Sequence, residues 1–286
     1  MVEVTILCDK VRFEEKALYE KTQSKGIKSK IVDAKTVTIG TYSKAKDFLL
    51  GDMILQRSVS YYRGLYLTAC LEFLGFKVIN RFEVGQICGN KILSSIRLAE
   101  NNIPTPKTQF AFSAESGLES IKKTGFPVVL KPVVGSWGRG IYPLRDLETA
   151  SIIVEMREED NSPLSRIYYI QEMIDRPPRD IRCIVIGDQA VTAIYRYSSQ
   201  SEWRTNVALG GKVELAPMTK EMEELALRAA EAVGGGILGV DMMEDKNHGL
   251  VVHEVNNTVE FRGAASVSKA DIANKMIEYV VNLARK

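Results

Sequence analysis

The sequence predicts an α/β protein made of three consecutive units, and three patterns support this prediction. Strand and helix patterns alternate up to about residue 85, as in a small α/β domain. A helix, a strand and a glycine-rich loop follow in residues 86–167. Residues 168–286 combine β-branched strands with the clearest amphipathic helix of the chain. We therefore expect units at 1–85, 86–167 and 168–286.

The composition is that of a soluble globular protein, with 45% hydrophobic and 26% charged residues. A net charge of +2 implies no general affinity for nucleic acid. No run of about 18 apolar residues suggests a membrane span, and the acid Glu3 indicates a first strand and not a signal peptide. Four scattered cysteines indicate reduced thiols in the cytoplasm. The two histidines disfavour a multi-histidine metal site and a Ser-His-Asp triad.

In the first unit, β-branched runs predict strands and longer amphipathic runs predict helices. The expected strands cover residues 2–8, 28–34, 52–60 and 77–80, and the expected helices cover residues 12–25 and 61–75. This order is the alternation of βαβ units.

The second unit opens with an expected helix at 90–102, which the sequence Pro-Thr-Pro stops. It continues to PVVLKPVVGSWGRG, residues 127–140, where a short strand ends in Lys131. A lysine there must reach solvent or meet an anion, because an unpaired buried ammonium is unfavourable. The glycines that follow permit backbone N–H groups to approach a ligand, a common arrangement for phosphate. A tight turn beside a surface lysine is the other interpretation.

In the third unit, we expect a strand at 166–174 and two strands in 180–198, turned at Gly187-Asp188. A helix follows, with Thr219 as its expected cap. One apolar stripe of this helix is expected to be core: Met222, Leu225, Ala226, Ala229, Ala230 and Val233.

Two apolar runs flank Lys-Asn-His-Gly, residues 246–249, and predict a hairpin with these four residues as its turn. Asp241 then faces Glu254, and Asn256 shares that face by the period of two. A hard cation such as Mg²⁺ takes oxygen donors and would offset the repulsion between the two carboxylates. A solvent-facing acidic edge, or a register shifted by one residue, would leave no metal site.

The lysine and glycine loop could hold polyphosphate, and the carboxylates could hold its magnesium. Together they predict a nucleotide site between the second and third units. No P-loop signature is present, and no dinucleotide-binding glycine motif follows the first strand. The lysine precedes the loop, which is opposite to the order in protein kinases.

The motifs CGNK, VVLKPVVGSWGRG, YYIQEM, RDIRC, TNVALGG, GVDMME and HEVNNTVEF, in this order, resemble those of the ATP-grasp superfamily. The closer match is to the LysX/ArgX ligases, relatives of the RimK glutamate ligases, and it covers essentially the whole chain. The resemblance implies an ATP-grasp fold of three subdomains, with ATP between the central and C-terminal ones. Residues 1–85 then correspond to the pre-ATP-grasp domain.

The resemblance also implies an activity. In these ligases, ATP phosphorylates the side-chain carboxylate of the C-terminal glutamate of LysW, a small acidic carrier protein. The α-amine of glutamate or 2-aminoadipate then attacks the acyl phosphate, in arginine or lysine biosynthesis. We expect ATP and Mg²⁺ as cofactors, with two ions, and a homo-oligomer, either a dimer or a tetramer.

The roles of the family carry over to matching positions. The resemblance implies that the nucleotide contacts are Lys91, Lys131, Gly135, Ser136, Trp137, Gly138, Arg139, Gly140, Gln171, Glu172, Arg179, Asp180, Arg196 and Asn206. The catalytic residues would be Arg182, Arg196 and Asn206, and the metal ligands Asp241, Glu254 and Asn256. Substrate contacts would be Arg182, Arg204, Asn257, Thr258, Gly263 and Ala264. Residues 198–212 are expected to be a lid over the water-sensitive acyl phosphate, or else a surface loop. Arg182 and Arg204 could instead be surface charges.

The sequence departs from the family at the position that selects the amino acid. Aminoadipate-specific members tend to carry Asn followed by Ser or Thr there, and glutamate-specific members Gly-Phe, whereas this chain has Gly263-Ala264. Dual specificity is therefore expected. One alternative is a RimK-like ligase that adds glutamate to another protein or joins small metabolites. Another is a non-catalytic nucleotide-binding regulatory module, which the intact set of Lys, Asp, Glu and Asn residues disfavours.

Overall fold

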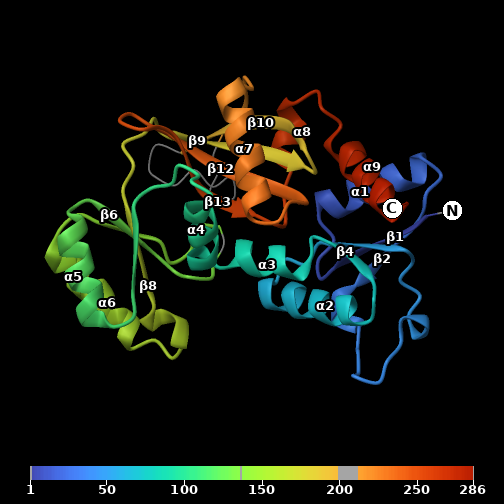
Figure 1. Cartoon of the computed structure of the whole chain (residues 1–286), viewed down its shortest axis with the longest axis horizontal. Coiled ribbons are helices and arrows are strands. Elements are labelled where there is room, and N and C mark those ends of the chain that lie inside the picture. The colour runs from blue at the N-terminus through green and yellow to red at the C-terminus, as the bar shows by residue number, and fades with distance from the viewer. Residues whose placement is uncertain (1, 136, 199–211, 286) are drawn as a thin grey trace.

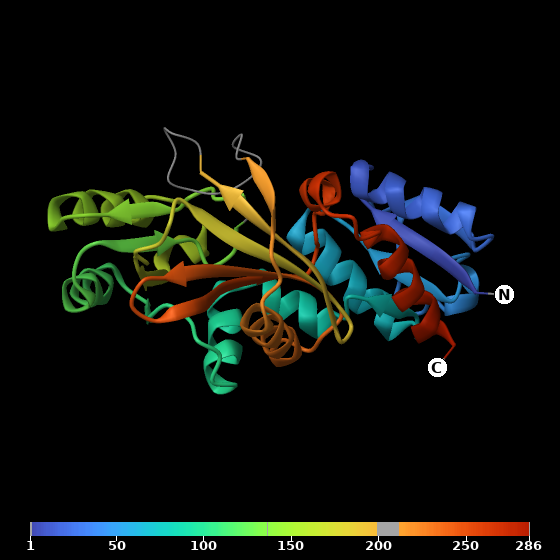
Figure 2. The same cartoon turned by 90° about the horizontal axis from the view of Figure 1, so that it is seen from above.

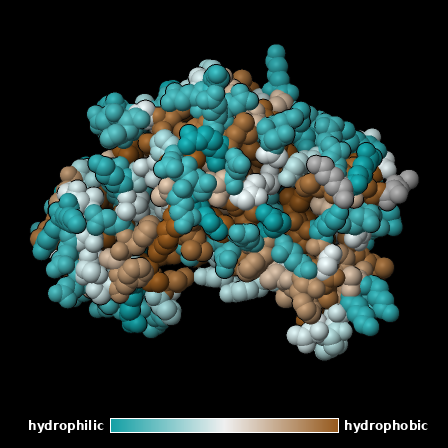
Figure 3. All heavy atoms as spheres, viewed as in Figure 1, coloured by the Kyte–Doolittle hydropathy of each residue, from teal (hydrophilic) through white to brown (hydrophobic). Residues whose placement is uncertain are grey.

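The computed structural model describes residues 2–135, 137–198 and 212–285. Three sheets follow one another along the long axis, and both chain ends lie beside the first sheet (Figures 1 and 2). Hydrophilic residues cover most of one face, whose lower edge is indented between the two ends of the molecule (Figure 3). The mixed α/β class predicted from the sequence is confirmed. Ser136, Arg204, Asn206 and nearly all of the predicted lid lie outside the described residues.

Four parallel strands form the first sheet, in the order β2-β1-β3-β4. Its elements are β1 (Glu3–Cys8), α1 (Phe13–Ser24), β2 (Lys28–Asp33), η1 (Ala34–Thr36), η2 (Ala45–Asp47), β3 (Met53–Gln56), α2 (Tyr61–Phe73) and β4 (Lys77–Ile79). Alternate residues of β1 point to opposite faces. Val4 and Ile6 therefore pack on the α1 side, and Leu7 packs on the α2 side.

The strand predicted at 52–60 is wrong beyond Gln56. The carboxylate of Asp9 accepts the backbone N–H of Val59 at 2.8 Å and that of Ser60 at 3.1 Å. These bonds hold the chain in a loop that leads into α2. The local β-branched pattern cannot show them, because their acceptor lies about 50 residues earlier in the chain.

The central sheet has the order β5-β8-β6-β7 and is covered by α5 and α6. The elements of this part are α3 (Phe82–Gly89), α4 (Lys91–Glu100), β5 (Thr108–Ala111), α5 (Ala114–Thr124), β6 (Val128–Lys131), β7 (Tyr142–Leu144), α6 (Leu147–Glu158), η3 (Pro163–Arg166) and β8 (Tyr168–Glu172). The helix expected at 90–102 corresponds to α4, and the short strand ending in Lys131 corresponds to β6. β8 follows the predicted unit boundary at residue 167 and yet completes this sheet.

The third sheet has five strands in the order β11-β10-β9-β12-β13. Its part of the chain contains β9 (Arg179–Ile186), β10 (Gln189–Tyr197), β11 (Val213–Ala216), α7 (Lys220–Ala232), β12 (Ile237–Asp245), β13 (Gly249–Asn256), α8 (Arg262–Val267) and α9 (Ile272–Ala284). The predictions for α7 are confirmed. Thr219 caps the helix by accepting the Met222 N–H at 3.2 Å, and every residue of the predicted stripe is buried.

The last helix, α9, returns to the first sheet (Figure 2). Its buried residues, which include Met276 and Val280, pack in one cluster with Val4 and Leu18. The same cluster includes Ile184 of β9, so α9 joins the first and third sheets. Among the described residues, no helix combines the length and the apolar character needed to span a membrane.

Candidate functional site

A cavity of about 850 Å³ is lined by residues from all three parts of the chain. Most of the predicted site residues line it: Lys91, Lys131, Gly135, Trp137, Gly138, Arg139, Asp180, Arg182, Arg196, Asp241, Glu254, Asn256, Asn257, Thr258, Gly263 and Ala264. Of the predicted residues that the structure describes, four do not line it: Gly140, Gln171, Glu172 and Arg179. The fold therefore brings together groups that are up to 173 positions apart in the chain.

Lys131 ends β6 and is buried, with 7% of its surface exposed. Its ammonium donates a hydrogen bond of 2.6 Å to Oε1 of Gln171. Within the described residues, no carboxylate forms an ion pair with it. Burial lowers the pKa of Lys131 to about 8, because the charged form loses its hydration there. A buried cation with only a neutral partner, facing a cavity, is suited to an anionic ligand.

The glycine-rich loop follows Lys131 and lines the same cavity. Gly138 and Gly140 have φ of +70° and +66°, a conformation that side chains with a Cβ rarely adopt. The guanidinium of Arg139 lies 5.4 Å from the ring centre of Trp137. The loop therefore needs its glycines for its own turns, in addition to any approach of a ligand.

Lys91 is the first residue of α4, whose cap is Asn90. The side chain of Asn90 accepts the N–H groups of Ile92 and Leu93, which sets where the helix begins. From there the Lys91 ammonium donates to the backbone oxygen of Gly135 at 3.1 Å and to Oε1 of Glu254 at 3.2 Å. Lys91 thus connects the glycine loop to the third sheet.

Four charged side chains lie beside one another on the cavity face of the third sheet. Arg182 donates two hydrogen bonds of 2.6 Å to Asp241, and Arg196 donates bonds of 2.7 and 2.8 Å to Asp180. Arg196 also lies 3.1 Å from Asp241. Although burial raises the pKa of Asp241, the charges of Arg182 and Arg196 hold it well below its usual range. Asp241 is therefore ionised at neutral pH.

The predicted pairing of Asp241 with Glu254 is confirmed, but the predicted turn is wrong. Asp245 pairs with Gly249, so the turn has three residues and not four. A bulge that leaves His253 unpaired then shifts the register by one residue and restores the pairing of the two carboxylates. The shorter turn and the bulge each shift the register by one residue, in opposite directions, so Asp241 still pairs with Glu254.

The structure separates Arg179 from the residues that follow it. Successive residues of β9 face opposite sides of the sheet, so Asp180 and Arg182 face the cavity and Arg179 faces away. Arg179 pairs with Glu244 at 2.8 and 2.9 Å, and its guanidinium lies 3.8 Å from the ring centre of Tyr195. The contacts with Glu244 and Tyr195 fix the Arg179 side chain on the side of the sheet away from the cavity.

Gln171 and Glu172 lie in the middle strand of β5-β8-β6. Gln171 is buried and supports Lys131 from behind, and its amide also donates to the hydroxyl of Thr108 at 3.0 Å. Glu172 accepts the backbone N–H of Lys107 at 2.6 Å. Both side chains therefore hold the strands together beside the cavity, whose wall they do not form.

The oxygen donors at the end of β13 fit a hard cation. Asp241 and Glu254 are directly opposed, and the Asn256 amide lies 3.2 Å from Oδ2 of Asp241. Burial raises the pKa of Glu254, but the charge of Lys91 opposes this and the net shift is downward. Two ionised carboxylates and an amide are ligands that Mg²⁺ accepts. The described residues contain no cluster of three or more His, Cys, Asp or Glu side chains suited to a metal.

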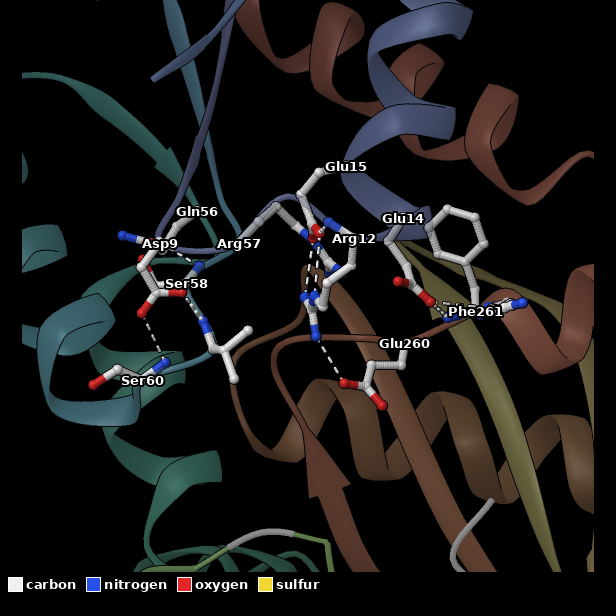
Figure 4. Close-up of polar contacts among 12 residues, drawn as sticks. Asp9, Arg12, Glu14, Glu15, Gln56, Arg57, Ser58, Ser60, Glu260 and Phe261 are labelled. Carbon is white, nitrogen blue, oxygen red and sulfur yellow. Dashed lines mark hydrogen bonds and ion pairs between the residues drawn. The ribbon is translucent and has the colours of Figure 1, made fainter. Parts of the chain in front are cut away.

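The sequence did not point to His253 or to the polar residues of the first sheet that line the cavity. Neither ring nitrogen of His253 has a hydrogen-bond partner among the described residues. Burial lowers the pKa of His253 to about 4, so the imidazole is neutral at pH 7. Arg12, Gln56 and Ser58 line the cavity, and Figure 4 shows them in one cluster of polar residues with Glu15 and Arg57. The polar residues after Gln56 could have been found at the end of β3. The local pattern predicted that the strand continues there, although the chain leaves the sheet.

Two family models match the chain, a LysX preATP-grasp domain over residues 4–87 and a RimK-like ATP-grasp domain over residues 88–280. The α-aminoadipate–LysW ligase LysX of Saccharolobus solfataricus is 37% identical over 278 residues, which cover 96% of this chain and 99% of the relative. The glutamate–LysW ligase ArgX of Sulfurisphaera tokodaii is 35% identical over 279 residues, 97% of each chain. A solved RimK-domain ATP-grasp protein from Sphaerobacter thermophilus superposes with a TM-score of 0.79 at 23% identity, over 98% of this chain and 99% of that one.

Proposed function

Because this chain belongs to the LysX/ArgX group of RimK-like ATP-grasp ligases, we propose that it joins the α-amino group of glutamate or 2-aminoadipate to LysW. It is an ATP-dependent ligase of lysine or arginine biosynthesis. The carboxylate that is activated is the side chain of the C-terminal glutamate of LysW, through an acyl phosphate. The observation that carries the proposal is Lys131, a buried ammonium without a carboxylate partner in the described residues, facing one cavity with Asp241 and Glu254.

Each charged group of the cavity has a separate proposed task. Lys131 and Lys91 hold the phosphates of ATP, one from the central sheet and one from the start of α4. Asp241, Glu254 and Asn256 would hold magnesium, which neutralises phosphate charge when bound. Arg182 and Arg196 lie beside that cluster and are placed to stabilise the charge that moves during phosphoryl transfer.

The remaining predicted contacts are also proposals. The end of β8 at Gln171–Glu172 would lie beside the adenine as its hinge, and Asn206 and Arg204 would act from outside the described residues. We also propose that the enzyme binds two magnesium ions, which metal titration tests. It would be a dimer or a tetramer, which sedimentation tests, and it would lie in the cytoplasm, which cell fractionation tests.

The decisive test is release of ADP by the purified protein with LysW, ATP and magnesium, with glutamate or 2-aminoadipate supplied in turn. We expect ADP formation that requires both the carrier and one of these amino acids. A mass increase of LysW by one amino-acid residue would identify the product. ADP release that proceeds equally well without LysW would contradict the proposed acceptor.

We expect the enzyme to use both amino acids, with kcat/KM values that differ by less than about 100-fold. The two substrates differ by one methylene, and Gly263 and Ala264 present little side chain to the cavity that they line. Ala264→Phe should shift the preference toward glutamate by occupying volume. Ala265→Phe, on the exposed side of α8, is the matched control. A preference above about a thousandfold in the unmodified protein would show that other residues set the selectivity.

Binding of ATP should weaken as the pH rises above about 8, the pKa to which burial lowers Lys131. Only the protonated lysine attracts polyphosphate, so the apparent Kd should rise by up to about tenfold for each pH unit above that pKa. Calorimetry between pH 7 and about pH 9.5 measures the trend. Lys131→Arg should bind with a flatter profile, because a guanidinium stays charged throughout. A wild-type Kd that is constant over this range would contradict the assignment.

A further inference from the structure

The cavity extends to the end of the first sheet, where Gln56 and Ser58 line it. In the order β2-β1-β3-β4, the chain runs from β1 to one side and from β3 to the other. The carboxyl ends of β1 and β3 therefore meet at the point where the strand order reverses. In parallel sheets such a switch point is where ligands bind. The loop after β1 carries Arg12, and the loop after β3 carries Arg57 and Ser58 (Figure 4).

Two polar groups of the β3 loop are buried without a hydrogen-bond partner among the described residues. They are the Ser58 hydroxyl and Nη2 of Arg57, in residues that are 5% and 2% exposed. Ser58 also lines the cavity. Buried hydrogen-bonding groups are nearly always satisfied, so an unpaired hydroxyl in a cavity wall indicates a missing partner.

Two guanidinium groups and several carboxylates lie around Ser58 (Figure 4). Arg57 and Arg12 share one carboxylate, since Oε1 of Glu15 accepts from both at 3.0 and 2.9 Å. The other carboxylate bound to Arg12 is Glu260, whose side chain is 42% exposed and therefore screened by solvent. Arg12 lines the cavity together with Ser58, so a carboxylate bound there would meet both a hydroxyl donor and a guanidinium.

The nearby carboxylates have donors of their own. Glu14 accepts the backbone N–H groups of Phe261 and Arg262 at 3.1 and 3.0 Å. Asp9 accepts backbone groups of the β3 loop and the guanidinium of Arg63 at 2.6 Å. Glu14 and Asp9 therefore already accept hydrogen bonds from groups other than the Ser58 hydroxyl.

We propose that this end of the cavity is a subsite for a carboxylate of the reactants, bound by the Ser58 hydroxyl and by the charge of Arg12. The carboxylate belongs either to the amino acid that is ligated or to the C-terminal residue of the carrier. The inference rests on the proposed function, because it assigns one end of the same cavity. The opposite end, at Lys131 and Lys91, is the one suited to ATP.

The test compares Ser58→Ala with Ser60→Ala. Ser60 lies in the same loop, makes no side-chain cap for α2 and does not line the cavity. Steady-state ADP release gives KM for ATP, for LysW and for each amino acid. Ser58→Ala should raise one KM by about tenfold or more, the loss expected for a hydrogen bond to a charged group, and leave the KM for ATP unchanged. A rise for the amino acid or for LysW identifies which reactant supplies the carboxylate.

A second variant, Arg12→Gln, should raise the KM of the same reactant. The inference is overturned if both variants keep all KM values within twofold of the wild type, or if they affect different reactants. It is also overturned if Ser58→Ala raises all four KM values together with a fall in Tm. Should the wild type not ligate either amino acid to LysW, calorimetric binding of glutamate, 2-aminoadipate and LysW tests the subsite by itself. Weaker binding of one of the three by Ser58→Ala supports it, and unchanged binding of all three, or no binding of any of them, overturns it.

Discussion

Glu254→Gln is expected to lower kcat/KM for ligation by about 10²- to 10³-fold, the range for losing one charged group that stabilises a transition state. Glu254 is opposed to Asp241, and the two carboxylates are the anionic members of the proposed magnesium site. A glutamine keeps the shape of the side chain and removes its charge. The measurement is ADP release with LysW and the preferred amino acid over a range of magnesium concentrations.

The fold should tolerate this change. Removing one of two opposed carboxylates relieves repulsion, while Lys91 loses a partner at 3.2 Å. We expect Tm to change by less than about 4 °C, equivalent to ~1 kcal/mol in a chain of this size. Glu244→Gln is the matched control, because Glu244 lies in β12 and pairs with Arg179 outside the cavity wall. Near wild-type activity of Glu254→Gln at ordinary magnesium would exclude this glutamate as a metal ligand.

Lys131→Met is expected to weaken the use of ATP by about 10- to 150-fold, which corresponds to ~1.5–3 kcal/mol for a charge-assisted contact. The methionine fills a similar volume and leaves Gln171 without its donor. The measurements are KM for ATP and calorimetric binding of ATP. Lys77→Met, at an exposed strand position, is the matched control.

Stability gives an independent test of the same variant. The pKa of Lys131 falls from an ordinary value of 10.5 to about 8 in the folded protein, so the unfolded chain holds the proton more tightly. Burial of the charged lysine therefore lowers the free energy of unfolding. The whole of this effect is present below pH 8, and it disappears as the pH rises toward 10.5. Lys131→Met should keep or raise Tm at neutral pH, and the gain should shrink in alkali. A large fall in Tm together with normal binding of ATP would make the lysine structural.

Local patterns in the sequence determined several parts of this protein. The buried stripe of α7 follows from apolar residues that recur every 3.6 positions. The start of the same helix follows from the hydroxyl of Thr219, which caps it. The strand that ends in Lys131, and the loop after it, follow from β-branched residues and glycines that are neighbours in the chain. Such features were predictable because their physical causes act over a few residues.

Only the tertiary structure decided which charged side chains meet. Arg182 contacts Asp241, and Arg196 contacts Asp180, because β9 lies between β10 and β12. The short β3 depends on Asp9, which follows another strand and accepts the N–H groups of Val59 and Ser60. Residue periodicity gives the face of a strand but not its neighbours. Strand order and loop contacts are set by burial and hydrogen bonding between segments far apart in the chain, which no local pattern contains.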